Sequence, residues 1–146
     1  MELEEDFKEF IQLLNANKVA YLVVGGYAVA AHGYPRYTGD IDFWVKPEKE
    51  NAINIVKALT EFGFGSLDID TNDFLKENYV VQLGYPPNRI DIMTGVSGLT
   101  FEDCWKAKEV IEVQGEKINF ISLYHLKLNK ENTGRDKDKL DLNNLP

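Results

Sequence analysis

Two aspartates separated by one residue are the clearest chemical signal in this sequence. Asp40 and Asp42 belong to the alternating segment Asp-Ile-Asp-Phe-Trp-Val at residues 40–45. Because side chains alternate between the two faces of a strand, both carboxylates should share one face, while Ile41 and Phe43 point into the core. Paired carboxylates suit Mg²⁺, which binds one or two of them together with phosphate oxygens. A solvated strand face is the alternative explanation of this spacing.

A pair of glycines precedes the aspartates. Gly25 and Gly26 follow the apolar run 19–24 and lead into the alanine-rich segment 27–32, which ends at Gly33. Glycine lets a backbone approach a ligand closely, and free N–H groups at the start of a helix favour a phosphate. A tight turn between a strand and a helix would need the same residues. The position of the aspartates on a neighbouring strand favours a shared site.

The elements that must position these residues alternate between helices and strands. Apolar residues recur at helical spacing in residues 2–16 and again after Pro47. Apolar or alternating runs bounded by turn residues predict strands at 19–24, 40–45, 79–83, 89–93, 109–113 and 117–121. Further helices are expected at 27–32, 100–106, 123–131 and 136–145. This mixture predicts a single domain of the α/β or α+β class over residues 1–146.

Taken together, the glycine pair and the aspartates resemble a known signature. An apolar residue, Gly25-Gly26, a short gap and Asp40-Ile41-Asp42 are similar to the motif of the DNA polymerase β-like nucleotidyltransferase superfamily. The fuller string resembles small bacterial nucleotidyltransferases, among them the abortive-infection toxins of type IV toxin–antitoxin systems. That string adds Tyr27, His32, Gly33, Arg36 and Thr38. The resemblance implies the nucleotidyltransferase fold, a small mixed sheet flanked by helices.

The resemblance also implies a third carboxylate on an adjacent strand. Asp91 stands between Ile90 and Ile92, so it should face away from the core as the first two aspartates do. Convergent carboxylates repel one another unless cations neutralise them, which favours a metal site over a structural cluster. By this resemblance Asp40, Asp42 and Asp91 are the catalytic and metal-binding residues, the ion is Mg²⁺ or Mn²⁺, and Asp91 also accepts a proton.

The C-terminal segment carries the basic part of the pattern. The same small nucleotidyltransferases end in a lysine followed by Gly-Arg-x-Lys-Asp-x-x-Asp, which here matches Lys130 and residues 134–141, although Asp136 stands where proline is common. The match implies that Lys130 and Arg135 neutralise triphosphate oxygens and that Asp138 either orients Arg135 or lies near the site. A solvated, charge-paired helix end is the alternative. The expected nucleotide-binding residues are Gly25, Gly26, Arg36, Thr38, Lys130 and Arg135.

Composition narrows the class of protein. The 146 residues carry a net charge of −8, which argues against a broad nucleic-acid-binding face. The single cysteine, Cys104, excludes an internal disulfide and fits a reducing compartment. The N-terminus lacks the features of a signal peptide, and no apolar run approaches the ~18 residues of a membrane span. We therefore expect a cytoplasmic protein without a membrane partner.

The activity that the resemblance implies is nucleotidyl transfer. A nucleoside triphosphate would give its NMP group to a hydroxyl on RNA such as tRNA, on a protein or on a small molecule, and pyrophosphate would leave. A cognate antitoxin and a second copy of the chain are further partners in this hypothesis. Two alternatives stay open: a catalytically inactive nucleotide-binding or toxin–antitoxin interaction domain, and a hydrolase that uses the same metal site. The three aspartates, all present, favour an enzyme.

Overall fold

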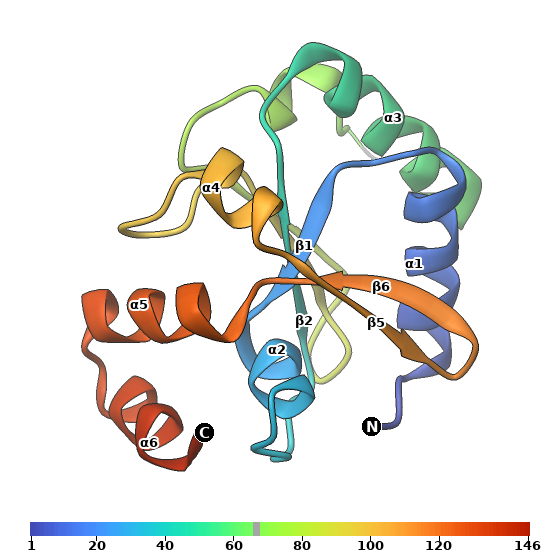
Figure 1. Cartoon of the computed structure of the whole chain (residues 1–146). Coiled ribbons are helices and arrows are strands. Elements are labelled where there is room, and N and C mark those ends of the chain that lie inside the picture. Colours follow the sequence, from blue (N-terminus) through green and yellow to red (C-terminus); the bar gives the residue numbers. More distant parts are fainter. Residues whose placement is uncertain (66–67) are drawn as a thin grey trace.

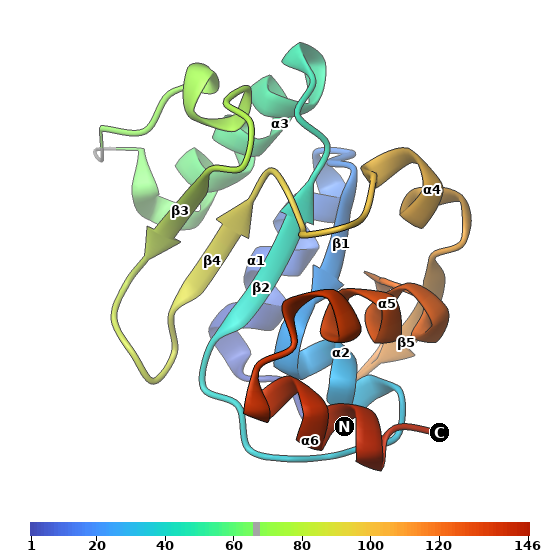
Figure 2. The same cartoon turned by 90° about the vertical axis from the view of Figure 1, so that its left-hand side faces the viewer.

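The computed structural model describes residues 1–65 and 68–146 of the chain. Within these residues, six strands form one mixed sheet in the order β3-β4-β2-β1-β6-β5 (Figures 1 and 2). The strands are β1 (Tyr21–Val24), β2 (Ile41–Val45), β3 (Val80–Leu83), β4 (Ile90–Met93), β5 (Glu109–Val113) and β6 (Glu116–Phe120). The helices are α1 (Glu5–Ala16), α2 (Gly25–Ala31), α3 (Lys49–Leu59), α4 (Phe101–Lys106), α5 (Leu123–Thr133) and α6 (Asp136–Asn144).

The pairing of the strands decides which side chains lie opposite each other. β2 is antiparallel to β1 and parallel to β4, and its register places Asp42 opposite Asp91. The pairs β3–β4 and β5–β6 are antiparallel hairpins, and β6 joins the sheet beside β1 in parallel. Two strands that are distant in sequence, β2 and β4, are therefore neighbours and bring their aspartates together.

Helices cover the two faces of the sheet differently. α1 and α3 pack on one face, whereas α2, α5 and α6 lie on the other (Figures 1 and 2). α1 follows the expected helical spacing, because Phe7, Phe10, Ile11 and Leu14 are its buried residues. The Glu4 side chain caps this helix by accepting hydrogen bonds from the backbone N–H groups of Asp6 and Phe7.

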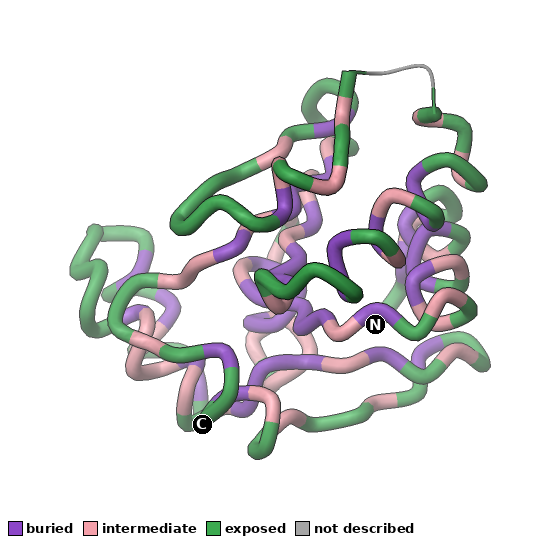
Figure 3. The backbone as a smooth tube through the Cα atoms, turned by 90° about the horizontal axis from the view of Figure 1, so that it is seen from above, coloured by how far each residue is buried: buried purple, intermediate pink, exposed green. Residues whose placement is uncertain are grey.

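The core lies between the sheet and the α1–α3 layer, and it takes up the apolar side of β2 and β4. Ile41, Phe43, Ile90 and Ile92 are all buried, as their alternation with aspartate predicts. The Phe43 ring packs edge-on against Phe10 of α1 at a centroid distance of 5.5 Å. Each such side chain contributes about 1.5–3 kcal/mol on burial, which anchors the strands that carry the aspartates. Figure 3 shows that buried residues gather toward the interior of the molecule.

The predicted elements agree with the structure except at their ends and in one connection. The glycine pair lies in the first turn of α2 instead of in a loop before it. The described residues between α3 and β3 contain a π-helical turn at Thr60–Phe64 and a 3₁₀ turn at Thr71–Phe74, the second closed by an Asp70 capping box. In the described part of the chain, none of the helices combines the length and apolar character that crossing a membrane requires.

Candidate active site

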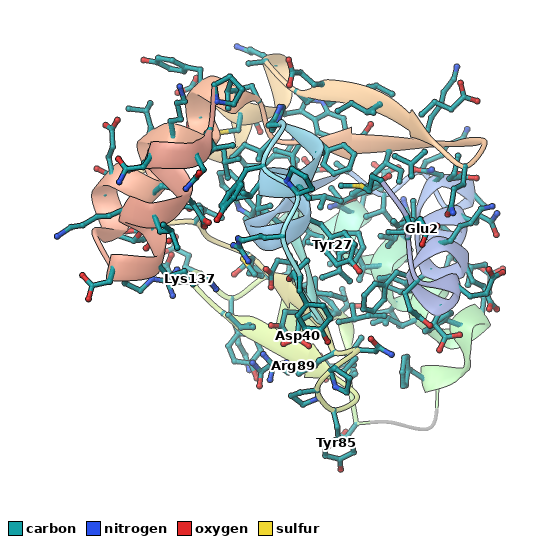
Figure 4. The ribbon with its side chains drawn as sticks, turned by 90° about the horizontal axis from the view of Figure 1, so that it is seen from below. Glu2, Tyr27, Asp40, Tyr85, Arg89 and Lys137 are labelled. Carbon is teal, nitrogen blue, oxygen red and sulfur yellow. The ribbon has the colours of Figure 1, made fainter. Side chains whose placement is uncertain are left out.

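All the residues that the sequence predicted for the site line one cavity of about 670 Å³. It lies where the Asp-bearing parts of β2 and β4, the first turn of α2 and the α5–α6 segment meet. Figure 4 shows Asp40 beside Arg89 in this region, with Lys137 on the α6 side. The predicted residues that line it are Gly25, Gly26, Arg36, Thr38, Asp40, Asp42, Asp91, Lys130 and Arg135.

Asp42 and Asp91 form the centre of the site. They are paired across the parallel strands β2 and β4, and Asp91 is buried. Burial, and next the adjacent Asp91 carboxylate, raises the pKa of Asp42 to about 6, while Lys137 lowers it and Asp40 raises it further. The direction of this shift follows from unneutralised negative charge in a poorly solvated place. Asp42 is therefore the carboxylate with the greatest need of a cation.

Arg89 already neutralises the other two carboxylates. Its Nε and Nη2 donate to the two carboxylate oxygens of Asp91 at 2.7 and 3.0 Å, and Nη2 lies 3.3 Å from Asp40 Oδ2. The Arg89 backbone N–H also donates to Asp40 Oδ1 at 3.0 Å. The sequence analysis assigned this residue no role, although its spacing of two from Asp91 on a strand places both on one face. The arginine thus occupies the position of a counter-ion.

The donor set fits a divalent cation at the Asp42–Asp91 pair, whose carboxylate oxygens are the hard ligands that Mg²⁺ prefers. Across residues 1–65 and 68–146, however, no three acidic, histidine or cysteine side chains are grouped to hold an ion. The Arg89 guanidinium binds both oxygens of Asp91 and pairs with Asp40. Joint ligation of an ion by Asp40, Asp42 and Asp91 stays a prediction.

Both glycines are required because a neighbouring side chain approaches the backbone of each too closely for a Cβ atom. Gly25 has a φ of +67°, and a Cβ there would overlap the Oδ2 atom of Asp42. A Cβ at Gly26 would lie 2.6 Å from Oγ1 of Thr38, a hydroxyl that donates to the backbone carbonyl of Asp40 at 3.2 Å. The glycines therefore let the first turn of α2 pack directly on the carboxylates and on the segment that leads to them.

Two of the predicted phosphate ligands are engaged in a buried ion network. Lys130 is only 3% exposed, and its Nζ lies 3.3 Å from Asp138 Oδ1 and 3.0 Å from Asp141 Oδ2. Arg36 donates through Nε and Nη2 to both oxygens of Asp141, each at 2.9 Å. Burial alone would raise the pKa of Asp141, but the hydrogen bonds from Arg36 and Lys130 lower it below its usual range. This network joins α5, α6 and the loop that precedes β2.

Arg135 is the most accessible cation of the predicted set. Its side chain is 64% exposed, and its Nε and Nη2 donate to Asp138 at 2.8 and 3.2 Å, so Asp138 orients it as expected. Burial would raise the pKa of Asp138, yet the bonds from Arg135, Thr133 and Lys130 hold it well below its usual range. Lys137 also lines the cavity. Both cations face the cavity that holds Asp42.

Two solved structures resemble this chain in their fold. TM1012 of Thermotoga maritima, whose assignment as a nucleotidyltransferase is inferred, superposes with a TM-score of 0.65. The superposition covers 94% of this chain and 88% of the TM1012 chain, at 22% sequence identity. The lincosamide antibiotic adenylyltransferase LnuA, solved with lincomycin bound, superposes with a TM-score of 0.60. The superposition covers 97% of this chain and 95% of the LnuA chain, at 16% sequence identity. The chain has the nucleotidyltransferase fold. No protein-family model and no curated protein sequence matches it.

The remaining candidate residues stabilise the nucleotidyltransferase fold. His32 Nε2 lies 2.7 Å from the carbonyl oxygen of Ile121, and its Nδ1 lies 3.2 Å from a carboxylate oxygen of Glu109. His125 contacts the hydroxyl of the α5 N-cap residue through Nδ1, and Cys104 is buried in the core. None of the three residues lines the carboxylate cavity.

Proposed function

We propose that this chain is a metal-dependent nucleotidyltransferase that moves an NMP group from a nucleoside triphosphate to a hydroxyl acceptor. One observation carries the proposal: on a nucleotidyltransferase fold, Asp42 and Asp91 face each other in the same cavity as the glycine turn and Arg135. The buried Asp42 carboxylate, whose pKa is raised, needs a neutralising cation, and the phosphate oxygens of a bound triphosphate need cations as well.

The proposed reaction forms one bond and breaks another at the α-phosphorus. The acceptor oxygen bonds to this phosphorus, the bond to the β-phosphate oxygen breaks, and pyrophosphate leaves. The hydroxyl proton passes to a carboxylate of the site, for which Asp91 is the candidate. Mg²⁺ or Mn²⁺ held by Asp40, Asp42 and Asp91 would supply neutralising charge and orient the phosphate oxygens. The protein itself mainly positions the reactants and stabilises charge.

Different residues of the cavity have different proposed roles in binding the triphosphate. The first turn of α2 at Gly25 and Gly26 packs against Asp42 and is the proposed cradle for the β- and γ-phosphates. Arg135 extends into the cavity from the start of α6 and would meet phosphate oxygens through its planar fork. Lys130, already paired with two buried aspartates, supports the α5–α6 wall and adds positive charge close to it.

The acceptor class is part of the proposal. LnuA is an adenylyltransferase solved with the antibiotic lincomycin, which supports ATP as the donor and a small molecule as the acceptor. The net charge of −8 favours the same choice over RNA, because a phosphate backbone is repelled by an acidic surface. A protein acceptor, a cognate antitoxin and a second copy of the chain remain hypotheses from the sequence resemblance, and a cytoplasmic location remains a hypothesis from the composition.

A labelling experiment tests the function. The protein is incubated with each α-³²P-labelled NTP in Mg²⁺, Mn²⁺ or EDTA, together with tRNA, protein or small-molecule fractions of a cell extract. We expect metal-dependent label on a small molecule, with one NTP preferred. Nucleotide consumption without a labelled acceptor would indicate a hydrolase. Metal-dependent thermal stabilisation by ATP without transfer to any fraction would indicate an inactive nucleotide-binding domain.

Arg135→Ala tests the triphosphate role of the exposed arginine. If its guanidinium binds β- or γ-oxygens, the variant should bind NTP about ten- to a hundredfold more weakly, with little change for the monophosphate. Arg135→Lys should recover only part of the loss, because the two-pronged contact is gone. Titrations with NTP and NMP at fixed Mg²⁺ and ionic strength measure the effect, and Lys139→Ala on the exposed side of α6 is the control. Unchanged NTP affinity in Arg135→Ala would rule this role out.

A further inference from the structure

A second cavity, of about 690 Å³, adjoins the carboxylate cavity. Tyr27 and Ala30 of α2 line it together with the N-terminal residues 1–4 and Asn88 of the β3–β4 connection. Residues 36–39 line both cavities, so this loop is their shared wall. In Figure 4, Tyr27 and Glu2 lie on one side of Asp40, and Lys137 lies on the other. The second cavity is therefore placed opposite the α5–α6 wall.

At two places, neighbouring residues of the chain line different cavities. Asn88 lines the second cavity and Arg89 the first, while Gly39 lines both and is followed by Asp40 of the first. A Cβ at Gly39 would overlap the carbonyl oxygen of Pro87, so the loop packs directly on the β3–β4 connection. A molecule in the second cavity consequently lies beside the segments that carry the site's carboxylates.

The lining of the second cavity combines an apolar surface with acidic side chains. Glu2 and Glu4 are its acidic residues. Among its described side chains the one basic group is Arg36, which is neutralised by its two 2.9 Å bonds to Asp141. The apolar side chains are Met1, Leu3, Tyr27, Ala30 and Pro35. This chemistry complements a molecule with an apolar body and a positive charge.

Tyr27 adds a polar atom to the apolar surface. Its ring is buried and packs edge-on against Phe7 at 5.7 Å. Burial, followed by the charges of Glu4 and Tyr37, raises the pKa of its hydroxyl. A hydroxyl on an otherwise apolar lining is the kind of isolated polar contact that orients a small molecule in a binding site.

We propose that the second cavity binds the acceptor, a small molecule with a hydroxyl group and a protonated amine on an apolar body. This inference rests on the proposed nucleotidyl transfer. The amine faces Glu2 and Glu4, the apolar body packs on Tyr27 and Ala30, and the hydroxyl reaches past the loop 36–39. The acceptor oxygen then bonds to the α-phosphorus, pyrophosphate leaves, and the hydroxyl proton passes to a carboxylate of the site.

The dimensions favour a small molecule over a macromolecule. Cavities of about 300–1,000 Å³ hold drug-sized ligands, and the second cavity falls within that range. The two acidic side chains and the acidic surface of the protein would repel the phosphates of an RNA. The same charges attract an amine.

Two probes that differ only in the amine test the charge of the site. Tryptophanol carries a hydroxyl and a protonated amine on an indole, and 3-indolepropanol has the hydroxyl without the amine. By calorimetry on the intact chain, tryptophanol should bind about two- to fivefold more tightly, and Glu2→Gln should abolish this preference. Equal affinity of the wild type for both probes, or no binding of either, would overturn the proposal.

A cavity-filling variant tests the location. Ala30→Trp should weaken binding of tryptophanol by at least about tenfold and remove its labelling by α-³²P-ATP, whereas Mg²⁺–ATP affinity should stay at the wild-type value. Ala16→Trp, at the exposed end of α1, is the matched control and should bind and label tryptophanol normally. Labelling that persists in a folded Ala30→Trp variant refutes the acceptor site alone. A wild type that binds no Mg²⁺–ATP and labels no acceptor refutes the proposed function instead.

Discussion

Replacing Asp42 with asparagine is expected to lower the rate of nucleotidyl transfer by about a hundred- to a thousandfold while making the metal-free protein more stable. The loss of rate follows from removing the carboxylate with the greatest need of a cation. The gain in stability follows because the same carboxylate is buried beside Asp91 and its pKa is raised to about 6. A purely structural residue would change both quantities in the same direction.

The gain in stability should depend on pH in a defined way. A carboxyl whose pKa rises on folding, here from 3.8 to about 6, stabilises the fold at low pH and loses that contribution as the pH rises through 6. Asparagine resembles the protonated form, so Asp42→Asn should match the wild type near pH 4. At pH 8 it should exceed the wild type by on the order of 2 kcal/mol, allowing for partial exposure of the side chain to solvent.

Chemical unfolding at pH 4 and pH 8 in EDTA measures the stability, and transfer of labelled NMP at saturating Mg²⁺ measures the rate. Glu77→Gln removes one negative charge from an exposed position and should leave both quantities unchanged. An Asp42→Asn variant with wild-type activity would exclude Asp42 from the reaction. A variant less stable than the wild type at pH 8 would contradict the account of an unneutralised carboxylate.

Replacing Lys130 with methionine should destabilise the protein by about 3–5 kcal/mol, because it leaves two buried carboxylates without their shared cation. Asp138 and Asp141 are 0% and 1% exposed, and the Lys130 Nζ lies within 3.3 Å of an oxygen of each. The penalty should shrink at low pH. Both aspartates have a lowered pKa in the folded protein, so their contribution is present above their ordinary pKa and is lost as the pH falls below it.

Urea unfolding at pH 7 and at pH 2.5, below the ordinary aspartate pKa, measures this penalty, and Lys139→Met is the control because Lys139 is exposed on α6. The control should cost under about 1 kcal/mol. The measurement also separates the two roles of Lys130. A residue that served only as a phosphate ligand would leave the free energy of unfolding unchanged and would lower NTP affinity at a temperature where both proteins are folded.

Much of the candidate site could be predicted because local spacing determines which face a side chain shares. The period of two in β2 and β4 places Asp40, Asp42 and Asp91 opposite the buried isoleucines and Phe43, and the structure has this alternation. The glycine pair could also be predicted as part of the site, since only glycine lets a backbone pack directly against another group. In the structure, the group that packs against Gly25 is the Asp42 side chain, and a phosphate is the further proposed neighbour.

The charge pairing of the site could not be predicted, because it depends on segments that are distant along the chain. Arg36 and Asp141 are 105 residues apart, and Arg89 and Asp40 are 49 apart. The sequence alone therefore could not show that Lys130 and Arg36 are held by buried aspartates, or that Arg89 already binds two of the predicted metal ligands. Burial then decides the energetics, since a cation among buried carboxylates is held far more tightly than one on a solvated helix.

By itself, the sequence determined the element types, the buried side of each strand and the group of residues that line the carboxylate cavity. These properties follow from periodicity and turn chemistry, which act over a few residues. The tertiary structure alone decided the strand order that pairs Asp42 with Asp91, the contact of Arg89 with Asp40 and the second cavity behind the loop 36–39. Those properties arise from contacts across the fold, where the packing of whole elements sets which charges meet and which remain exposed.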